Sequence, residues 1–304
     1  MQLSTNRLST RGDQARPEFQ FRRILVLTDF FRGAQSALEC ARAIARKFNS
    51  KIFLLHVIPS GVFQFISPES AAEALRRARE FAEQEMQRLL NEPGAQDLLH
   101  EGIVAEGPVW PTISDTINTR QIDLIAMGTQ SGGSEKKLVL GAMAEQIYRL
   151  ADCPILTAPP EIAASQNVAL DRLLFATDFM PHNERAANIA HSLECNSAGQ
   201  LTVLHVVEEP TESSRQSHTL VKDFLIQRMR KSLPTSCLEL CAPQFAVRFG
   251  KPVEEILSAS EQLHSELILL GLRPTLRTAG YLPSAKAYGI VCQAHCPVLT
   301  LRQK

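Results

Sequence analysis

The chain has 304 residues, of which 44% are hydrophobic and 21% are charged, so it is long enough for two domains with sizeable cores. Its 32 basic and 32 acidic side chains cancel, which removes the main driving force for non-specific binding to nucleic acid. The sequence contains no apolar stretch of the length that crosses a membrane. We therefore expect neither nucleic acid nor a membrane as a partner.

Residues 1–20 are polar, contain three arginines and lack the apolar centre of a signal peptide, so we expect a disordered tail. The seven cysteines are odd in number and scattered, as is typical of reduced thiols in the cytoplasm. Cys237/Cys241 and Cys292/Cys296 are each spaced four apart, unlike the tight C-x-x-C turns of structural zinc sites. The sequence thus predicts a cytoplasmic protein without a bound metal.

Short apolar runs alternate with helical patterns along the whole chain. The first five runs, which predict strands, lie at 23–29, 51–57, 100–106, 122–127 and 154–158. The next five lie at 172–177, 200–207, 243–249, 266–270 and 297–301. Helical spacing of apolar residues separates them, most clearly at 34–48 and 73–90. Strands that are apolar on both faces and alternate with helices predict a parallel sheet covered on both sides.

The second set of elements repeats the first. "RILVLTDF" (23–30) matches "RLLFATDF" (172–179), and "ADCPILT" (151–157) matches "AHCPVLT" (294–300). The offset is 149 residues at the start and 143 at the end, so the second copy is shorter by six residues. We therefore predict two tandem, doubly wound α/β domains at 21–160 and 171–304, each with a five-stranded parallel sheet, joined by a linker at 161–170.

The last strand of each copy, 154–158 and 297–301, is strongly apolar. An exposed edge strand of that composition is prone to aggregation, and pairing the two strands removes both edges. We expect the halves to form an intramolecular pseudo-dimer. Whether two chains associate further, giving a homodimer, stays open.

The repeated blocks resemble the universal stress protein family. The features that carry the resemblance are "LVLTDF", "LLHV", "EGPV", "AMGTQSGG…LGAMAEQI" and "ADCPILT", with counterparts in the second half. The resemblance implies a five-stranded parallel sheet between helices and a stress-response or regulatory protein that is not an enzyme. Some members of the family bind ATP and others do not.

In the ATP-binding members, the phosphates are held by a loop with the pattern Gly, two residues, Gly, nine residues, Gly, then Ser or Thr. The first copy keeps Gly128 and Gly141, has Ser131 in place of the middle glycine and Ala142 in place of the hydroxyl, and carries Gly132 and Gly133 one and two residues late. Asp29 and Val57 match the family's adenine side. The resemblance therefore implies a degraded ATP site formed by Asp29, Val57, Gly128, Gly132, Gly133 and Gly141.

The second copy departs further from the pattern. It keeps Asp178 and Gly271, but Pro274 stands at the middle glycine and has no amide hydrogen to donate. Ser284 replaces the last glycine. We predict that ATP, where it binds, binds once per chain and in the first domain.

Two residue types allow a second interpretation. Asp29 and Asp178 follow strands at the edge where α/β folds bind ligands, and a turn aspartate has the same position. His56 and His205 lie inside apolar strands and are expected to be packed and hydrogen-bonded. The main alternative function is a ligand-independent interaction scaffold with unknown protein partners. A slow nucleotide hydrolase is disfavoured, because the sequence places no general base or carboxylate pair beside the loop.

Overall fold

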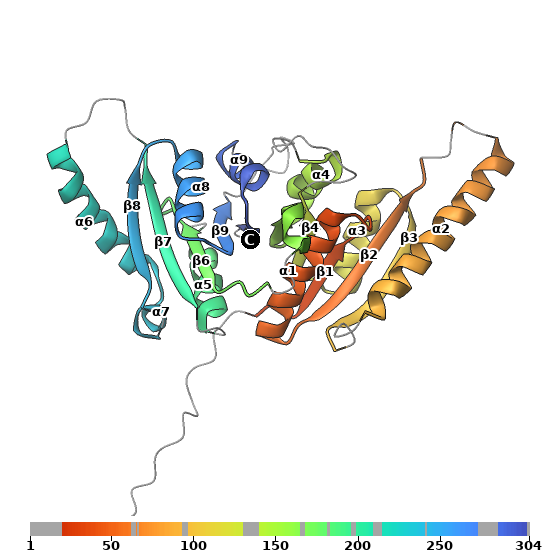
Figure 1. The fold of residues 1–304 in the computed structure, drawn as a ribbon, viewed down its shortest axis with the longest axis horizontal. Coiled ribbons are helices and arrows are strands. Elements are labelled where there is room, and N and C mark those ends of the chain that lie inside the picture. The colour runs from red at the N-terminus through yellow and green to blue at the C-terminus, as the bar shows by residue number, and fades with distance from the viewer. Residues whose placement is uncertain are drawn as a thin grey trace, which may run out of the picture.

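The computed structural model describes residues 20–61, 65, 67–92, 97–129, 140–164, 168–180, 183–195, 199–208, 215–240, 242–272 and 285–302. In this part of the chain, two α/β halves lie side by side (Figure 1). The first half contains β1 (Arg23–Leu27), α1 (Arg32–Phe48), β2 (Lys51–Pro59), α2 (Pro68–Leu90), β3 (Leu99–Gly107), α3 (Val109–Thr119), β4 (Leu124–Gly128), α4 (Ala142–Leu150) and β5 (Ile155–Ala158). The 3-10 helix η1 (Pro160–Ala164) follows. The second half contains β6 (Arg172–Ala176), α5 (Glu184–Cys195), β7 (Gln200–Val207), α6 (Arg215–Ser232), α7 (Thr235–Leu240), β8 (Gln244–Phe249), α8 (Pro252–Gln262), β9 (Leu267–Leu272), α9 (Ala285–Gln293) and β10 (Val298–Arg302).

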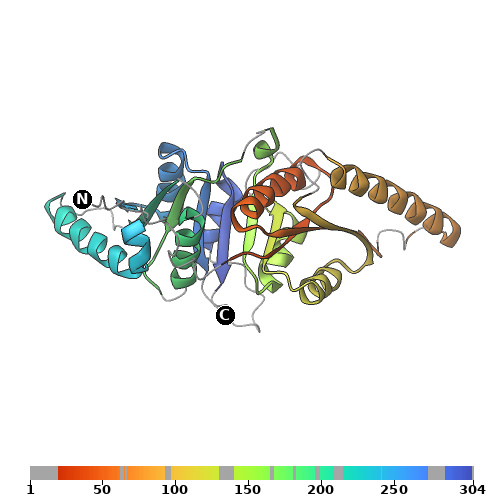
Figure 2. The ribbon, with the colours of Figure 1, turned by 90° about the horizontal axis from the view of Figure 1, so that it is seen from below.

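The strands of both halves join in one sheet. Among the described residues, ten strands follow the order β3-β2-β1-β4-β5-β10-β9-β6-β7-β8. All pairs within a half are parallel, and β5 and β10 are antiparallel. Figure 2 shows the last strands of the two halves in the middle, with α2 and α6 at opposite ends. The predicted fold class, two tandem doubly wound domains with five parallel strands each, is confirmed.

The core has two layers, one on each face of the sheet. Successive residues of β1 alternate between them: Ile24 and Val26 pack in one layer, and Leu25 and Leu27 in the other. The first layer is covered by α1, α2, α5 and α6, and the second by α3, α4, α8 and α9. Each layer contains residues of both halves, so the apolar core is continuous across the junction.

Element boundaries differ from the predicted ones by a few residues. The first strand stops at Leu27 rather than at residue 29, because Thr28 to Phe30 form a tight turn. The charged helix begins at Pro68, five residues before the predicted start at 73, and the Ser67 side chain accepts a hydrogen bond from the Ser70 amide at 3.3 Å. A serine cap followed by proline is a favoured helix start.

Polar side chains are paired at the junction of the halves. Leu299 of β10 lies opposite Leu156 of β5. The Thr157 hydroxyl donates to the Val298 carbonyl at 3.2 Å, and the Thr300 hydroxyl donates to the Ile155 carbonyl at 3.1 Å. Both hydroxyls are also 3.4 Å from the hydroxyl of Tyr148, which is fully buried. Each buried hydroxyl therefore has a partner, as a stable interior requires.

We expect residues 1–160, expressed alone, to dimerise or aggregate. Removal of β10 uncovers the apolar edge of β5 and the ring of Tyr148. Size-exclusion chromatography with light scattering measures the outcome. A well-behaved monomeric half would contradict the expectation that the two halves need one another.

Candidate functional site

The site predicted for the first half lies where the chain reverses its direction of travel across the sheet. β1 lies between β2 and β4, so the connections on its two sides run in opposite directions. Ligands of open α/β sheets bind in the crevice that this reversal leaves at the carboxyl ends of the strands. Asp29, Val57 and Gly128 lie at this edge and line one open pocket of about 600 Å³, its mouth included.

Most of the pocket wall is apolar and was not predicted. The additional lining residues are Leu27, Thr28, Ala34, Leu55, His56, Ile113, Met127, Met143, Ala144 and Ile147. For some of these residues, the sequence repeat contains a signal that could have identified them. At the same offset of 143 residues, Ile113 and Ile147 correspond to Ile256 and Ile290, so the same side chain recurs at equivalent positions.

The amino end of α4 borders the pocket. Gly141 is the N-cap of this helix, and its carbonyl accepts the Glu145 amide at 3.0 Å. Met143 and Ala144, in the first turn, contribute to the wall. The first amides of a helix have no intrahelical acceptor and carry a partial positive charge, which favours an anion. Gly132 and Gly133, together with Ser131, lie outside the described residues.

The position of Gly128 requires glycine for a packing reason that the sequence did not indicate. A Cβ at this position would lie 2.5 Å from the backbone carbonyl carbon of Gly33, at the start of α1. Only glycine allows the end of β4 and the first turn of α1 to come this close. Gly128 therefore serves the packing of the fold as well as the pocket.

A tight turn after β1 holds Asp29 at the pocket. The Asp29 Oδ1 atom accepts the Phe31 amide at 3.0 Å, and the Thr28 hydroxyl accepts the Phe30 amide at 3.0 Å. Phe30 has a φ of 65°, in a region that bulky side chains seldom adopt. Its ring stacks on His56 with 4.6 Å between the centroids, and His56 Nδ1 donates to the Thr28 carbonyl at 2.8 Å. Asp29 is thus both a turn aspartate and a pocket residue.

The same turn recurs after β6. Phe179 has a φ of 61° and stacks on His205 at 4.3 Å, and His205 Nδ1 lies 2.7 Å from the Thr177 carbonyl. Asp178 Oδ1 accepts the Met180 amide at 3.2 Å. The prediction that His56 and His205 are packed, hydrogen-bonded residues is confirmed.

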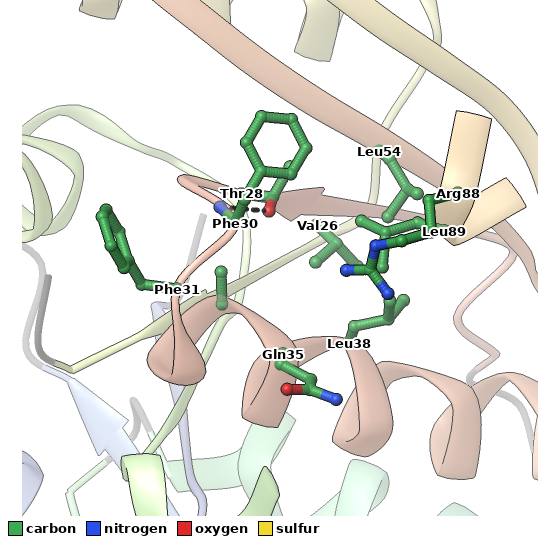
Figure 3. Close-up of a pocket in the computed structure, with 10 residues that line it drawn as sticks. Val26, Thr28, Phe30, Phe31, Gln35, Leu38, Leu54, Arg88 and Leu89 are labelled. Atoms are coloured by element: carbon green, nitrogen blue, oxygen red, sulfur yellow. Dashed lines mark hydrogen bonds between the residues drawn. The ribbon is translucent and has the colours of Figure 1, made fainter. Parts of the chain in front are cut away.

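A smaller crevice lies on the other side of the Thr28 turn. It measures about 340 Å³, its open mouth included, and lies between α1, α2, β1 and β2. Figure 3 shows Arg88 extending toward Leu38. Arg88 is already paired with Glu85 at 3.0 Å and with Glu92 at 3.3 Å. We assign no ligand to this crevice.

The equivalent region of the second half differs at two wall positions. Asn183 stands where the first half has Ala34, and its amide donates to Asp178 Oδ1 at 2.5 Å. Lys286 stands where the first half has Met143, and its ammonium is 2.6 Å from Glu208, the residue that follows β7. Asn183 therefore engages Asp178, the counterpart of the pocket residue Asp29, whereas Glu208 stands where the first half has Pro59. Gly271 lies in β9, whereas Pro274 and Ser284 lie outside the described residues.

The described cysteines are spread through the fold. Burial raises the pKa of Cys153 to about 12 and that of Cys296 to about 11, so these thiols stay protonated at neutral pH. Cys237 is buried on α7, and Cys241 lies outside the described residues. Among the residues that the structure describes, no three His, Cys, Asp or Glu side chains cluster closely enough to hold a metal ion. No helix in that part has the length and apolar character needed to span a bilayer.

We expect the free energy of unfolding to fall as the pH falls below about 6.5, the ordinary pKa of histidine. Burial lowers the pKa of His205 and also that of His191, so the unfolded chain takes up these protons before the folded protein does. Stability is lost wherever the unfolded state binds more protons. Urea unfolding at several pH values measures the slope, and His205→Gln should flatten it. An unchanged slope in this variant would contradict the assignment.

Comparison with known proteins agrees with the fold. The universal stress protein family model matches residues 20–159 and again residues 169–302. A universal stress protein of Methanocaldococcus jannaschii is 25% identical over 143 residues, which cover 45% of this chain and 81% of that protein.

Two solved structures share the architecture of the whole chain. A universal stress protein from Archaeoglobus fulgidus has 20% identity and a TM-score of 0.68, with 94% of this chain and 100% of that chain covered. A putative universal stress protein from Pseudomonas aeruginosa has 18% identity and a TM-score of 0.59, with 93% of each chain covered. The repeat, the two five-stranded halves of the sheet and both family matches lead to one conclusion: this chain belongs to the universal stress protein family, with two family domains in tandem.

Proposed function

We propose that the first half binds one adenine nucleotide, ATP, and that the protein is a non-enzymatic regulator whose signal is the bound nucleotide. The observation that carries this proposal is the convergence of Asp29, Val57 and Gly128 on one pocket beside the amino end of α4. The pocket combines an apolar wall for a base with a carboxylate acceptor and a helix terminus suited to phosphate.

The individual side chains fit an adenine nucleotide. Val57, Ile113 and Met143 offer an apolar surface to the ring. Oδ1 of Asp29 is engaged by the Phe31 amide, which leaves Oδ2 to accept from the exocyclic amino group of adenine. Gly141 and the first turn of α4 would receive the phosphates. Ala142 supplies no hydroxyl, so the backbone amides carry this end of the site.

The absence of catalysis is part of the proposal. Asp29 and His56 are the titratable groups in the described wall of the pocket, and hydrogen bonds to their own turn hold both. A hydrolase needs a base or metal that activates water next to the phosphate. A turnover assay with and without Mg²⁺ tests this part, and nucleotide hydrolysis that depends on Asp29 would overturn it.

Titration calorimetry with ATP tests the binding. We expect one equivalent per chain, and nucleotide should be released when the purified protein is denatured. No heat and no released nucleotide would reject the proposal and favour the alternative, a ligand-independent interaction scaffold. The residue that favours this alternative is Ala142. It stands where the pattern of the ATP-binding family members has a Ser or Thr hydroxyl that contacts the phosphates.

A further inference from the structure

Both ends of α4, the helix beside the proposed nucleotide site, are held by the second half. At the carboxyl end, the Arg302 guanidinium donates to the carbonyls of Tyr148, Arg149 and Ala151. At the amino end, Tyr288 of α9 makes the contact, and Figure 1 shows α4 and α9 near the middle of the molecule. Hydrogen bonds from the second half therefore restrain both termini of α4, whose apolar face packs on the core.

The Tyr288 hydroxyl makes two hydrogen bonds at the entrance to α4. It accepts the amide of Leu140 at 3.1 Å and donates to Glu145 Oε1 at 3.1 Å. Leu140 is buried and directly precedes Gly141, the N-cap. One hydroxyl therefore ties the backbone before the helix to a side chain in its first turn.

This contact matters for an anion at the helix end. The unpaired amides of the first turn attract phosphate, and a carboxylate in the same turn competes for them. Glu145 is such a carboxylate. The Tyr288 hydroxyl pairs with Oε1 of Glu145, and Nη2 of Arg149 lies 3.8 Å from Oε2. The Glu145 carboxylate is thereby kept from the amides of its own helix.

The hydrogen bond between Tyr288 and the Leu140 amide has no counterpart from the first half to the second. Glu145 and Tyr288 occupy equivalent positions in the two copies, 143 residues apart. The residue equivalent to Leu140 is Pro283, which has no amide hydrogen. The first half therefore cannot return the same hydrogen bond to the second half.

We propose that Tyr288 is a positioning residue for the nucleotide site of the other half: it orients the backbone at Leu140 and Gly141 and holds Glu145 away from the phosphates. The second half, in which Asn183 engages the Asp29 counterpart Asp178, thereby completes the site in the first half. This role rests on the proposed binding of ATP and adds to it the part of the chain on which phosphate recognition depends.

The test compares ATP with adenosine on the full chain by titration calorimetry. Tyr288→Phe keeps the ring and removes only the hydroxyl. Both of its hydrogen bonds, to the Leu140 amide and to Glu145, are then lost. We expect the Kd for ATP to rise about fivefold, because these bonds orient the site and do not themselves contact the ligand. Adenosine has no phosphates, so its binding free energy should hardly change, and its Kd should change less than about twofold. A general loosening of the fold would not distinguish the two ligands.

Two further variants complete the design. Thr300→Val removes a hydroxyl from the same junction but at β10, and it should leave both dissociation constants unchanged. Glu145→Gln removes the competing charge, so the loss caused by Tyr288→Phe should be smaller in that background. Wild-type protein that binds no ATP rejects the proposed function, and the role of Tyr288 with it. Wild-type binding with an equal Kd in Tyr288→Phe, or equal losses for ATP and adenosine, overturns only the role of Tyr288.

Discussion

Asp29→Asn is expected to weaken ATP binding about tenfold or more, whereas Asp178→Asn should leave it nearly unchanged. The asparagine keeps an oxygen for the Phe31 amide, so the turn after β1 is preserved. Its amide group then replaces the free carboxylate oxygen, and a donor meets the adenine amino group. A hydrogen bond to a charged acceptor is worth roughly 1.5–3 kcal/mol, which sets the size of the effect.

The matched substitution in the second half serves as the control. Asp178 Oδ1 already accepts from the Met180 amide and from the Asn183 side chain, and the Lys286–Glu208 pair joins α9 to the end of β7. We therefore place the single site in the first half. Calorimetry on the wild type and both variants decides the matter. Two equivalents of ATP per chain, or equal losses in the two variants, would refute the asymmetry.

The strands were predictable because their local pattern is strong. β1, β2, β4, β6 and β7 are apolar on both faces, and their predicted positions differ from the observed ones by at most two residues at either end. The repeat made the prediction firmer, since each strand occurs twice in the same order. The conformation of the turn after β1 was harder to predict from the sequence. Phe30 has a positive φ and its ring packs against His56, which lies 26 positions later in the sequence, so no local pattern indicates this turn.

The site was predicted in part, for a physical reason. Asp29, Val57 and Gly128 lie at or near the carboxyl ends of β1, β2 and β4, so the topology of the sheet alone brings them together. Tyr288 contacts Leu140 across 148 positions, and the Asn183–Asp178 bond depends on side-chain direction at a helix start. Neither contact leaves a periodic signal. Comparison of the two copies position by position reveals where Ala34 became Asn183 and Met143 became Lys286, but not what the new side chains touch.

Gly128→Ala is expected to lower the free energy of unfolding by about 3 kcal/mol, the upper part of the usual range for overpacking. Its Cβ would lie 2.5 Å from a backbone carbon and 2.8 Å from the Gly33 carbonyl oxygen. Backbone atoms cannot rotate away as a side chain can, so β4 and α1 would have to separate. Urea unfolding followed by circular dichroism measures the loss.

Gly61→Ala is the control for this stability test, because a Cβ at Gly61 meets no atom within 4 Å. Its unfolding midpoint should stay within about 0.5 kcal/mol of the wild type. Equal midpoints for Gly128→Ala and the wild type would contradict the packing argument. A large loss without any nucleotide present would show that the first glycine of the loop pattern is required by the fold itself. Gly271 persists in β9 although Pro274 and Ser284 have replaced the other glycines of the second loop, so this glycine can persist without the rest of the pattern. A glycine at the end of the fourth strand is therefore weak support for nucleotide binding, and Asp29 with the amino end of α4 carries the stronger argument.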